Sequence, residues 1–221
     1  MFAKEVYVRR RKALLDKMKG ERGIALFIGN VDAPAQYKDN CYKWRQDSTW
    51  LYFFGIDEPR FAATIDLETG EETIYADDFS IDDIIWMGPM PSVSSLATRV
   101  GVSKTAPYDA MSEALKGRVV HFVPASRYAT RLKLAELLGL SPYEVTSDGK
   151  KGCAKASRAL VEAVVSLRLI KEDVEITALE AACDLGYSMH AAARKGIRPG
   201  RVEQEIVGEM EGVTLSKGRG V

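Results

Sequence analysis

Residues 44–59 read WRQDSTWLYFFGIDEP, and this stretch is the most informative part of the chain. Polar residues that favour turns lead directly into an aromatic run, which Gly55 closes and an acidic-proline turn ends. We expect the aromatic run to be a strand that enters the core of a sheet, with Arg45 and Gln46 at the sheet mouth, the end of the sheet where this strand begins.

The segments around this stretch predict a sheet flanked by helices. The apolar run 24–28 is typical of a buried strand, and the segments 61–66 and 72–76 flank a turn and so predict a hairpin. Helices are expected at residues 4–18, 93–100, 108–115 and 127–138, and one further strand at 119–123. Helices mixed with hairpin-linked and isolated strands indicate the α/β class with a mixed β-sheet.

The charge balance argues against a polyanionic partner. The 221 residues suit one large domain or one domain plus part of a second. Lys and Arg number 31, as do Asp and Glu, so no excess charge attracts nucleic acid or an anionic membrane. We expect the basic cluster at 9–12 to face solvent on the first helix, beside an apolar face that includes Leu14 and Met18.

Several features indicate a cytoplasmic protein. No apolar run approaches the roughly 20 residues needed to span a bilayer, and residues 1–12 lack the apolar segment of a secretory signal. The three cysteines, Cys41, Cys153 and Cys183, are odd in number and far apart, which argues against a disulfide framework or a zinc ribbon.

The chain changes character in its last third. The polar run 148–152 is followed by a predicted helix at 156–167 and a long helix from 172 to 195, whose apolar residues form a single stripe. The run Arg-Pro-Gly at 198–200 ends this helix, and a further apolar stripe starts at Val202. Because little chain remains to cover these faces, we expect another protein surface to do so.

The opening stretch resembles a family signature. Its pattern, R-Q-D-S-x-W-x-Y-x-x-G-x-x-E-P over residues 45–59, resembles that of the N-terminal domain of Xaa-Pro aminopeptidases (aminopeptidase P). That domain is the non-catalytic half of a metallopeptidase, and the resemblance implies the creatinase/prolidase type of mixed sheet. Arg45 and Gln46 are expected to brace the sheet mouth or an interdomain surface rather than to touch substrate. The signature residues are Arg45, Gln46, Ser48, Tyr52, Gly55, Glu58 and Pro59.

A second match lies further along the chain. Residues 167–176 read LRLIKEDVEI and resemble the junction that opens the family's catalytic domain, an α+β "pita-bread" fold. The resemblance implies an N-terminal domain at 1–167, followed at 168–221 by a linker and the first helices of the catalytic domain. The matching positions of the junction are Arg168, Lys171 and Glu175.

The resemblance implies a metallopeptidase as the full-length protein. The family hydrolyses the bond between an N-terminal residue and a following proline, using two divalent metal ions, typically manganese, that share a hydroxide. The implied ligands are two Asp, one His and two Glu, which suit Mn²⁺, and the first pair lies in a D-x-G-x-x-x-x-x-Y-x-x-D motif. No such string follows Lys171. We therefore expect a truncated chain that binds no catalytic metal and is inactive by itself.

One residue is a candidate for substrate access. Trp86 lies in IIWMG at 84–88, which resembles the family pattern I-W-x-G-R-R, although Pro89 and Met90 stand where two Arg are common. In some family members this Trp reaches across a subunit interface to line a neighbour's substrate pocket, where its flat apolar face suits a proline ring. The alternative is a Trp packed in the core.

The remaining titratable residues predict no site. His121, inside a strand pattern, and His190, on the polar side of a helix, lack acidic or thiol neighbours at ligand spacing, so structural or surface roles are expected. Ser80 and Asp83 are spaced as at a capping-box-like helix start. The acidic pairs 77–78 and 82–83 are therefore better explained by helix capping and a solvated loop than by a metal cluster. No G-x-S-x-G motif supports a catalytic Ser–His pair.

The implied role of this domain is oligomerisation, at least to a homodimer, and restriction of the access of proline-containing peptides to the active site. Two alternatives stay open. A prolidase or creatinase-type hydrolase would share the domain plan, and a peptidase-like module without metal ligands could be a non-catalytic binding protein, as in histone chaperones that carry this fold.

Overall fold

The computed structural model describes residues 1–146 and 157–217. Contacts between residues divide the chain into two units, Met1–Leu169 and Ile170–Val221. The polar run 148–152 and Cys153 lie outside the described residues. In the part of the chain that is described, no helix is long and apolar enough to cross a membrane.

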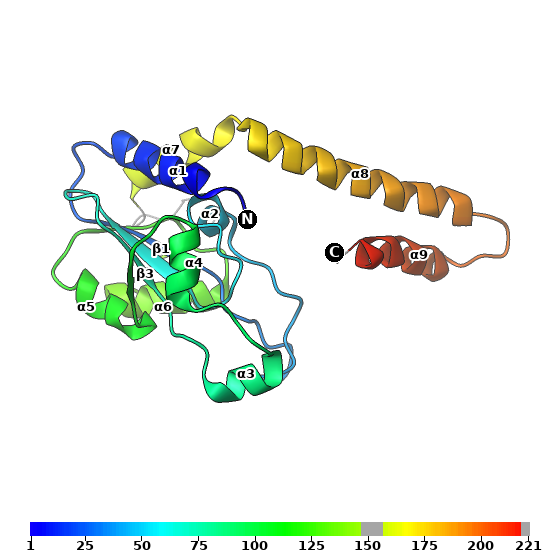
Figure 1. Ribbon diagram of the computed structural model, residues 1–221, viewed down its shortest axis with the longest axis horizontal. Coiled ribbons are helices and arrows are strands. Elements are labelled where there is room, and N and C mark those ends of the chain that lie inside the picture. Colours follow the sequence, from blue (N-terminus) through cyan, green and yellow to red (C-terminus); the bar gives the residue numbers. More distant parts are fainter. Residues whose placement is uncertain (147–156, 218–221) are drawn as a thin grey trace. The chain divides into compact units, whose positions relative to one another are not determined.

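A five-stranded mixed sheet forms the centre of the first unit (Figure 1). The strand order is β4-β3-β2-β1-β5. The β1–β2 and β2–β3 pairs are antiparallel, whereas β1–β5 and β3–β4 are parallel. The predicted hairpin is therefore confirmed as β2–β3, and the mixed sheet is confirmed as well. The strands are β1 (Ile24–Ile28), β2 (Ala62–Asp66), β3 (Glu72–Tyr75), β4 (Lys104–Ala106) and β5 (Val120–His121).

Helices cover both faces of this sheet, and β1 shows how the two cores are separated. Ala25 and Phe27 point into a core shared with α1, α2, α4 and α7, while Ile24 and Leu26 point into a core shared with η1, α5 and α6. Such alternation is the period of a strand buried on both sides. The helices are α1 (Lys4–Lys17), α2 (Ser48–Phe53), α3 (Ile81–Met87), α4 (Val93–Arg99), η1 (Tyr108–Ala110), α5 (Met111–Leu115), α6 (Tyr128–Leu138) and α7 (Arg158–Leu169).

The aromatic run of the signature is a helix, so the prediction of a strand there was wrong. Asp47 caps α2, because its Oδ1 accepts hydrogen bonds from the backbone N–H groups of Thr49 and Trp50 at 2.8 and 2.9 Å. Trp50, Phe53 and Phe54 are buried, and their i, i+3, i+4 spacing is that of one helix face. An N-cap, this spacing and the glycine that follows outweigh the strand preference of aromatic side chains.

The basic cluster at 9–12 is only partly solvated, which corrects a second expectation. Arg10 and Arg11 are 2% and 0% exposed. Arg11 donates from Nη1 to the carbonyl of Phe53 and from Nη2 to that of Val100, both at 2.9 Å, and its Nε lies 2.9 Å from Glu72 Oε1. The Nε contact is an ion pair without hydrogen-bond geometry. Buried guanidinium groups require such partners, and these come from distant segments.

The second unit is a pair of helices, α8 (Asp173–Gly196) and α9 (Glu203–Ser216). The two helices pack on each other, and Lys217 Nζ donates to Ser188 Oγ at 2.9 Å. Gly200 has a φ of 87° in the turn that separates them. Both helices expose apolar side chains, namely Val174, Ile176, Leu179, Tyr187, Val207 and Leu215.

Candidate functional site

Gln46 connects three parts of the chain around the signature. This buried side chain accepts hydrogen bonds at Oε1 from the backbone N–H groups of Asn30 at 2.6 Å and Asp47 at 2.8 Å. Its Nε2 donates to the carbonyl of Glu58 at 2.8 Å, and Asn30 Nδ2 donates to the carbonyl of Arg45 at 2.8 Å. Because the Gln46 amide bonds to backbone on both sides, it links the segment after β1 to both ends of the signature.

The other polar signature residues lie nearer the surface. The side chains of Arg45 and Ser48 are exposed, and those of Glu58 and Pro59 are partly buried. Burial raises the pKa of the Glu58 carboxyl, and the neighbouring charge of Asp57 adds a smaller increase. None of these groups gathers into a catalytic arrangement among the described residues.

Tyr52 connects α2 to the first and last helices of the first unit. Arg10 Nη1 donates to the carbonyl of Tyr52 at 3.0 Å, and the Arg10 guanidinium lies 4.0 Å from the centre of the Tyr52 ring, a cation–π arrangement. The Tyr52 hydroxyl donates to the carbonyl of Leu167 at 2.9 Å, and Arg168 Nη1 donates to Thr49 Oγ1 at 2.9 Å. The structure thus brings the signature and the first residue of the junction match together.

The other two junction residues lie at the start of the second unit. Lys171 precedes α8, and Glu175 lies in its first turn. Glu175 Oε2 accepts a hydrogen bond from the backbone N–H of Glu172 at 3.1 Å, as part of a capping box. A carboxylate at this position stabilises a helix start.

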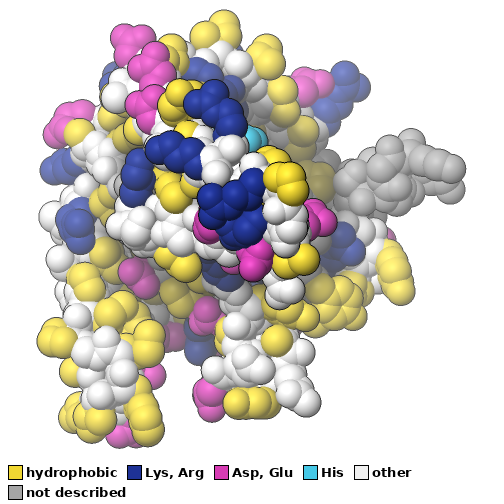
Figure 2. Space-filling model, turned by 90° about the vertical axis from the view of Figure 1, so that its right-hand side faces the viewer, with side chains coloured by type: hydrophobic (Ala, Val, Ile, Leu, Met, Phe, Trp, Pro, Cys, Tyr) yellow, Lys and Arg dark blue, Asp and Glu magenta, His cyan; other side chains and the backbone are white. Residues whose placement is uncertain are grey.

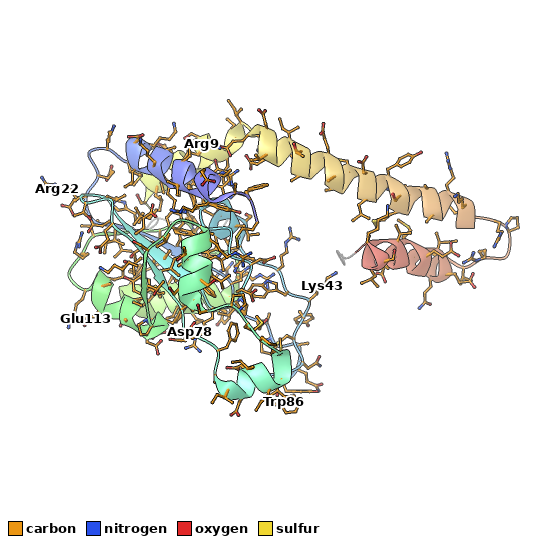
Figure 3. All side chains as sticks on the ribbon, in the orientation of Figure 1. Arg9, Arg22, Lys43, Asp78, Trp86 and Glu113 are labelled. Carbon is orange, nitrogen blue, oxygen red and sulfur yellow. The ribbon has the colours of Figure 1, made fainter. Side chains whose placement is uncertain are left out.

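Residues 79–92, which we call the arm, leave the sheet after β3 and return at α4. No side chain of α3, the helix of the arm, is buried, and Trp86 is 86% exposed. Trp86 therefore does not pack in the core. Ile81, Ile85 and Met87 are exposed as well. Figure 3 shows Trp86 on the projecting helix α3. In Figure 2, hydrophobic side chains are plentiful on the lowest part of the surface, which is the height at which α3 lies in Figure 1.

The arm has local order of its own. Ser80 and Asp83 form the predicted capping box, and hydrogen bonds from Ser80, with a contribution from Lys38, lower the pKa of the Asp83 carboxyl. Lys38 belongs to the segment 33–42, which a backbone bridge between Pro34 and Cys41 closes. This segment adds two exposed aromatic side chains, Tyr37 and Tyr42.

No metal centre is found among residues 1–146 and 157–217. They contain no group of three or more His, Cys, Asp or Glu that could hold a metal ion. A cavity beside the ends of β1 and β5, lined in part by Asn30, Asp47 and Arg127, measures about 30 Å³. That volume holds a water molecule but not a peptide.

His121 and Ser157 form a close pair whose role is structural. The His121 Nδ1 atom lies 2.7 Å from Ser157 Oγ, and its Nε2 lies 2.9 Å from the carbonyl of Arg22. Ser157 Oγ also accepts a hydrogen bond from the backbone N–H of Leu160, in the first turn of α7, at 3.3 Å. The Nδ1 contact therefore holds the start of α7 at the edge strand β5, and the Nε2 contact connects β5 to the segment before β1. His190 is exposed on α8.

The family model of the aminopeptidase P N-terminal domain matches residues 7–121, more than half of the chain. The chain belongs to this family. Its aminopeptidase P N-terminal domain includes the signature, the sheet and the arm, so the family predicted from the signature is confirmed.

Relatives extend the likeness beyond that domain. The chain is 24% identical over 204 residues to a "probable Xaa-Pro aminopeptidase" of Ajellomyces capsulatus (strain H143), covering 89% of this chain and 36% of the relative. It is 24% identical over 219 residues to the Xaa-Pro aminopeptidase of Escherichia coli (strain K12), covering 94% and 48%. The solved low-pH form of aminopeptidase P from E. coli matches with a TM-score of 0.77 at 21% identity, covering 99% of this chain and 50% of that chain. The chain thus spans half or less of the length of these relatives.

Sequence reasoning missed several residues that organise this aminopeptidase P N-terminal domain. Arg10 and Arg11, which were expected on a solvated face, are buried. Their apolar neighbours on the first helix were the available signal, because a charged residue between core positions must be paired or exposed. The partners themselves lie too far along the chain to be found by spacing.

Proposed function

We propose that this chain is the N-terminal, non-catalytic part of a metal-dependent Xaa-Pro aminopeptidase. In this proposal the full-length protein hydrolyses the bond between an N-terminal residue and a following proline, and residues 168–221 open its catalytic domain. The family match and the similarity to Xaa-Pro aminopeptidases over most of the chain support it. A cytoplasmic location stays a prediction from sequence.

The role proposed for this domain is self-association and control of substrate access through the arm. The observation that carries it is the exposure of Trp86 together with Ile81, Ile85 and Met87 on a short projecting helix. Exposed clusters of large apolar side chains mark interaction sites, and Trp is the residue type most often found at the energetic centre of an interface. A proline ring and an apolar subunit surface both suit such a side chain.

The family's pair of divalent metal ions, taken to be manganese, does not fit the described residues of this chain. Because no three metal-ligating side chains converge there, those residues supply no two-metal centre, and no chemical step is assigned to them. In the proposal, the ligands belong to the remainder of the full-length protein.

Enzymatic activity is tested on the full-length product of the reading frame and on the 221-residue chain. We expect Mn²⁺-dependent release of the first residue from an Xaa-Pro-Xaa peptide by the full-length protein and none by the chain alone. Inactivity of the full-length protein with Mn²⁺ and with other divalent metals would contradict the peptidase assignment and favour the binding-module alternative.

Self-association is tested by sedimentation of the wild-type chain and the Trp86→Ser variant. Loss of an interface Trp is expected to weaken association at least about tenfold. The matched control is Tyr143→Ser, since Tyr143 is an aromatic residue that is 88% exposed but lies outside the arm. Equal association of wild type and Trp86→Ser would exclude the arm as the contact.

A further inference from the structure

The two ends of the arm are held together by one side chain. Asp78, where the arm leaves, accepts at Oδ1 a hydrogen bond from the backbone N–H of Val93, where the chain returns, at 2.6 Å. Figure 3 labels Asp78 near the base of the projecting segment that bears Trp86. Hydrogen bonds from an N–H to an ionised carboxylate are shorter and stronger than those between neutral groups.

Both sides of this base are attached to the body of the first unit. Val93 is buried and begins α4, whose Leu96 and Ala97 lie in the core. The neighbouring Asp77 accepts a hydrogen bond at Oδ1 from the backbone N–H of Tyr108 at 3.1 Å. The backbone N–H of Ala76 donates to the carbonyl of Ala106 at 3.1 Å, next to the β3–β4 pair. The base is therefore well fixed, and the arm beyond it has no buried side chain on its helix.

A loop closed at its base by a hydrogen bond loses part of its conformational freedom before it meets a partner. Ordering such a segment on binding costs free energy, so restricting it beforehand favours binding. The capping box of Ser80 and Asp83 orders α3 internally, whereas the Asp78–Val93 hydrogen bond sets how the arm leaves the sheet. The pair borders an open hollow of about 270 Å³, so shortening Asp78 does not create a void in the core.

We propose that Asp78 is a positioning residue, whose carboxylate fixes the arm so that Trp86 is presented in one direction to its partner surface. The proposal rests on the function proposed above for the arm. In that function Trp86 makes the contact, and the present proposal adds that Asp78 orients the arm that carries Trp86.

The first test measures amide hydrogen exchange in the 221-residue chain. In Asp78→Ala we expect exchange of the Val93 amide to rise at least about tenfold, as for loss of a hydrogen bond to a charged group, and exchange in the arm to rise with it. Asp78→Asn keeps an acceptor oxygen and should restore part of the protection. Asp77→Ala is the matched control, because it should affect Tyr108 and leave Val93 unchanged.

The second test separates positioning from a purely structural role. In the full-length protein, Asp78→Ala should raise KM for an Xaa-Pro-Xaa peptide several-fold with kcat retained, or weaken self-association to a similar degree, and Asp78→Asn should restore part of the loss. Unchanged exchange at Val93 would overturn the proposal, as would faster exchange without any change in KM or association. If the wild-type protein hydrolyses no such peptide, the proposed peptidase function fails, while exchange and association still decide the role of Asp78.

Discussion

Gly55 occupies a position in the signature where no side chain fits. Its φ is 63°, in the left-handed region, and a Cβ atom there would lie 2.2 Å from Cζ and from the hydroxyl oxygen of Tyr7. Tyr7 is buried and accepts a hydrogen bond at its hydroxyl from the backbone N–H of Phe2 at 2.8 Å. The glycine therefore allows the chain to turn after α2 and lets α1 approach it closely.

Gly55→Ala should lower the free energy of unfolding by about 2–4 kcal/mol, from backbone strain and from displacement of Tyr7. The control is Gly139→Ala, because Gly139 has nearly the same φ of 62° but no atom within 4 Å of a built Cβ. Urea unfolding of both variants measures the difference. Equal losses of stability would show that contact with Tyr7 contributes nothing.

At the scale of elements, α2 depends on its cap. The helix is short, from Ser48 to Phe53, and short helices are marginal without tertiary packing or capping. It nevertheless accepts hydrogen bonds from Arg10 and Arg11 of α1 and from Arg168 at the end of α7. Its backbone must be helical for these donors to find their acceptors.

Asp47→Ala should lower the free energy of unfolding by about 1 kcal/mol, because two backbone N–H groups of α2 lose their acceptor. Asp47→Asn should cost less, since an amide oxygen also caps. Ser48→Ala is the control at the next, exposed position. Thermal unfolding followed by circular dichroism gives the comparison, and an unaltered midpoint for Asp47→Ala would exclude the cap as a source of stability.

At the scale of the whole first unit, an ion-pair cluster joins segments at one end of the sheet. Arg118, just before β5, donates from Nη2 to Asp66 Oδ2 at 2.8 Å and to Glu68 Oε2 at 3.1 Å. Burial alone would raise the pKa of the Asp66 carboxyl, but hydrogen bonds from Arg118 and the backbone N–H groups of Thr69 and Glu68 outweigh it and lower the pKa to about 2.

This lowered pKa predicts a contribution to acid stability. The stabilisation is complete above the ordinary value of 3.8 and is lost as the pH falls from there through about 2, because the unfolded chain takes up the proton first. Asp66→Asn should reduce stability near neutral pH and flatten its fall in this range. Asp32→Asn, at an exposed position, is the control. Identical pH profiles for wild type and Asp66→Asn, measured by urea unfolding, would contradict the prediction.

Patterns within a few residues predicted much of the fold. The hairpin β2–β3, the helices α1, α6 and α8, and the capping box of Ser80 and Asp83 follow from spacing, turns and caps that act locally. The signature also identified the family, because it is a contiguous run. The same run misled about its own conformation, since aromatic residues suit a strand and a helix alike, and the N-cap at Asp47 decides in favour of the helix.

The sequence by itself determined the class of the fold, the family and most of the helices and strands, because those depend on neighbours along the chain. Only the tertiary structure decided that Arg11 is buried, that Tyr52 contacts the end of α7 and that Trp86 is exposed. Arg11 donates to carbonyls 42 and 89 positions away, and the Tyr52 hydroxyl to one 115 positions away. Burial and pairing at such separations are set by how the sheet and its helices pack, which no local pattern records.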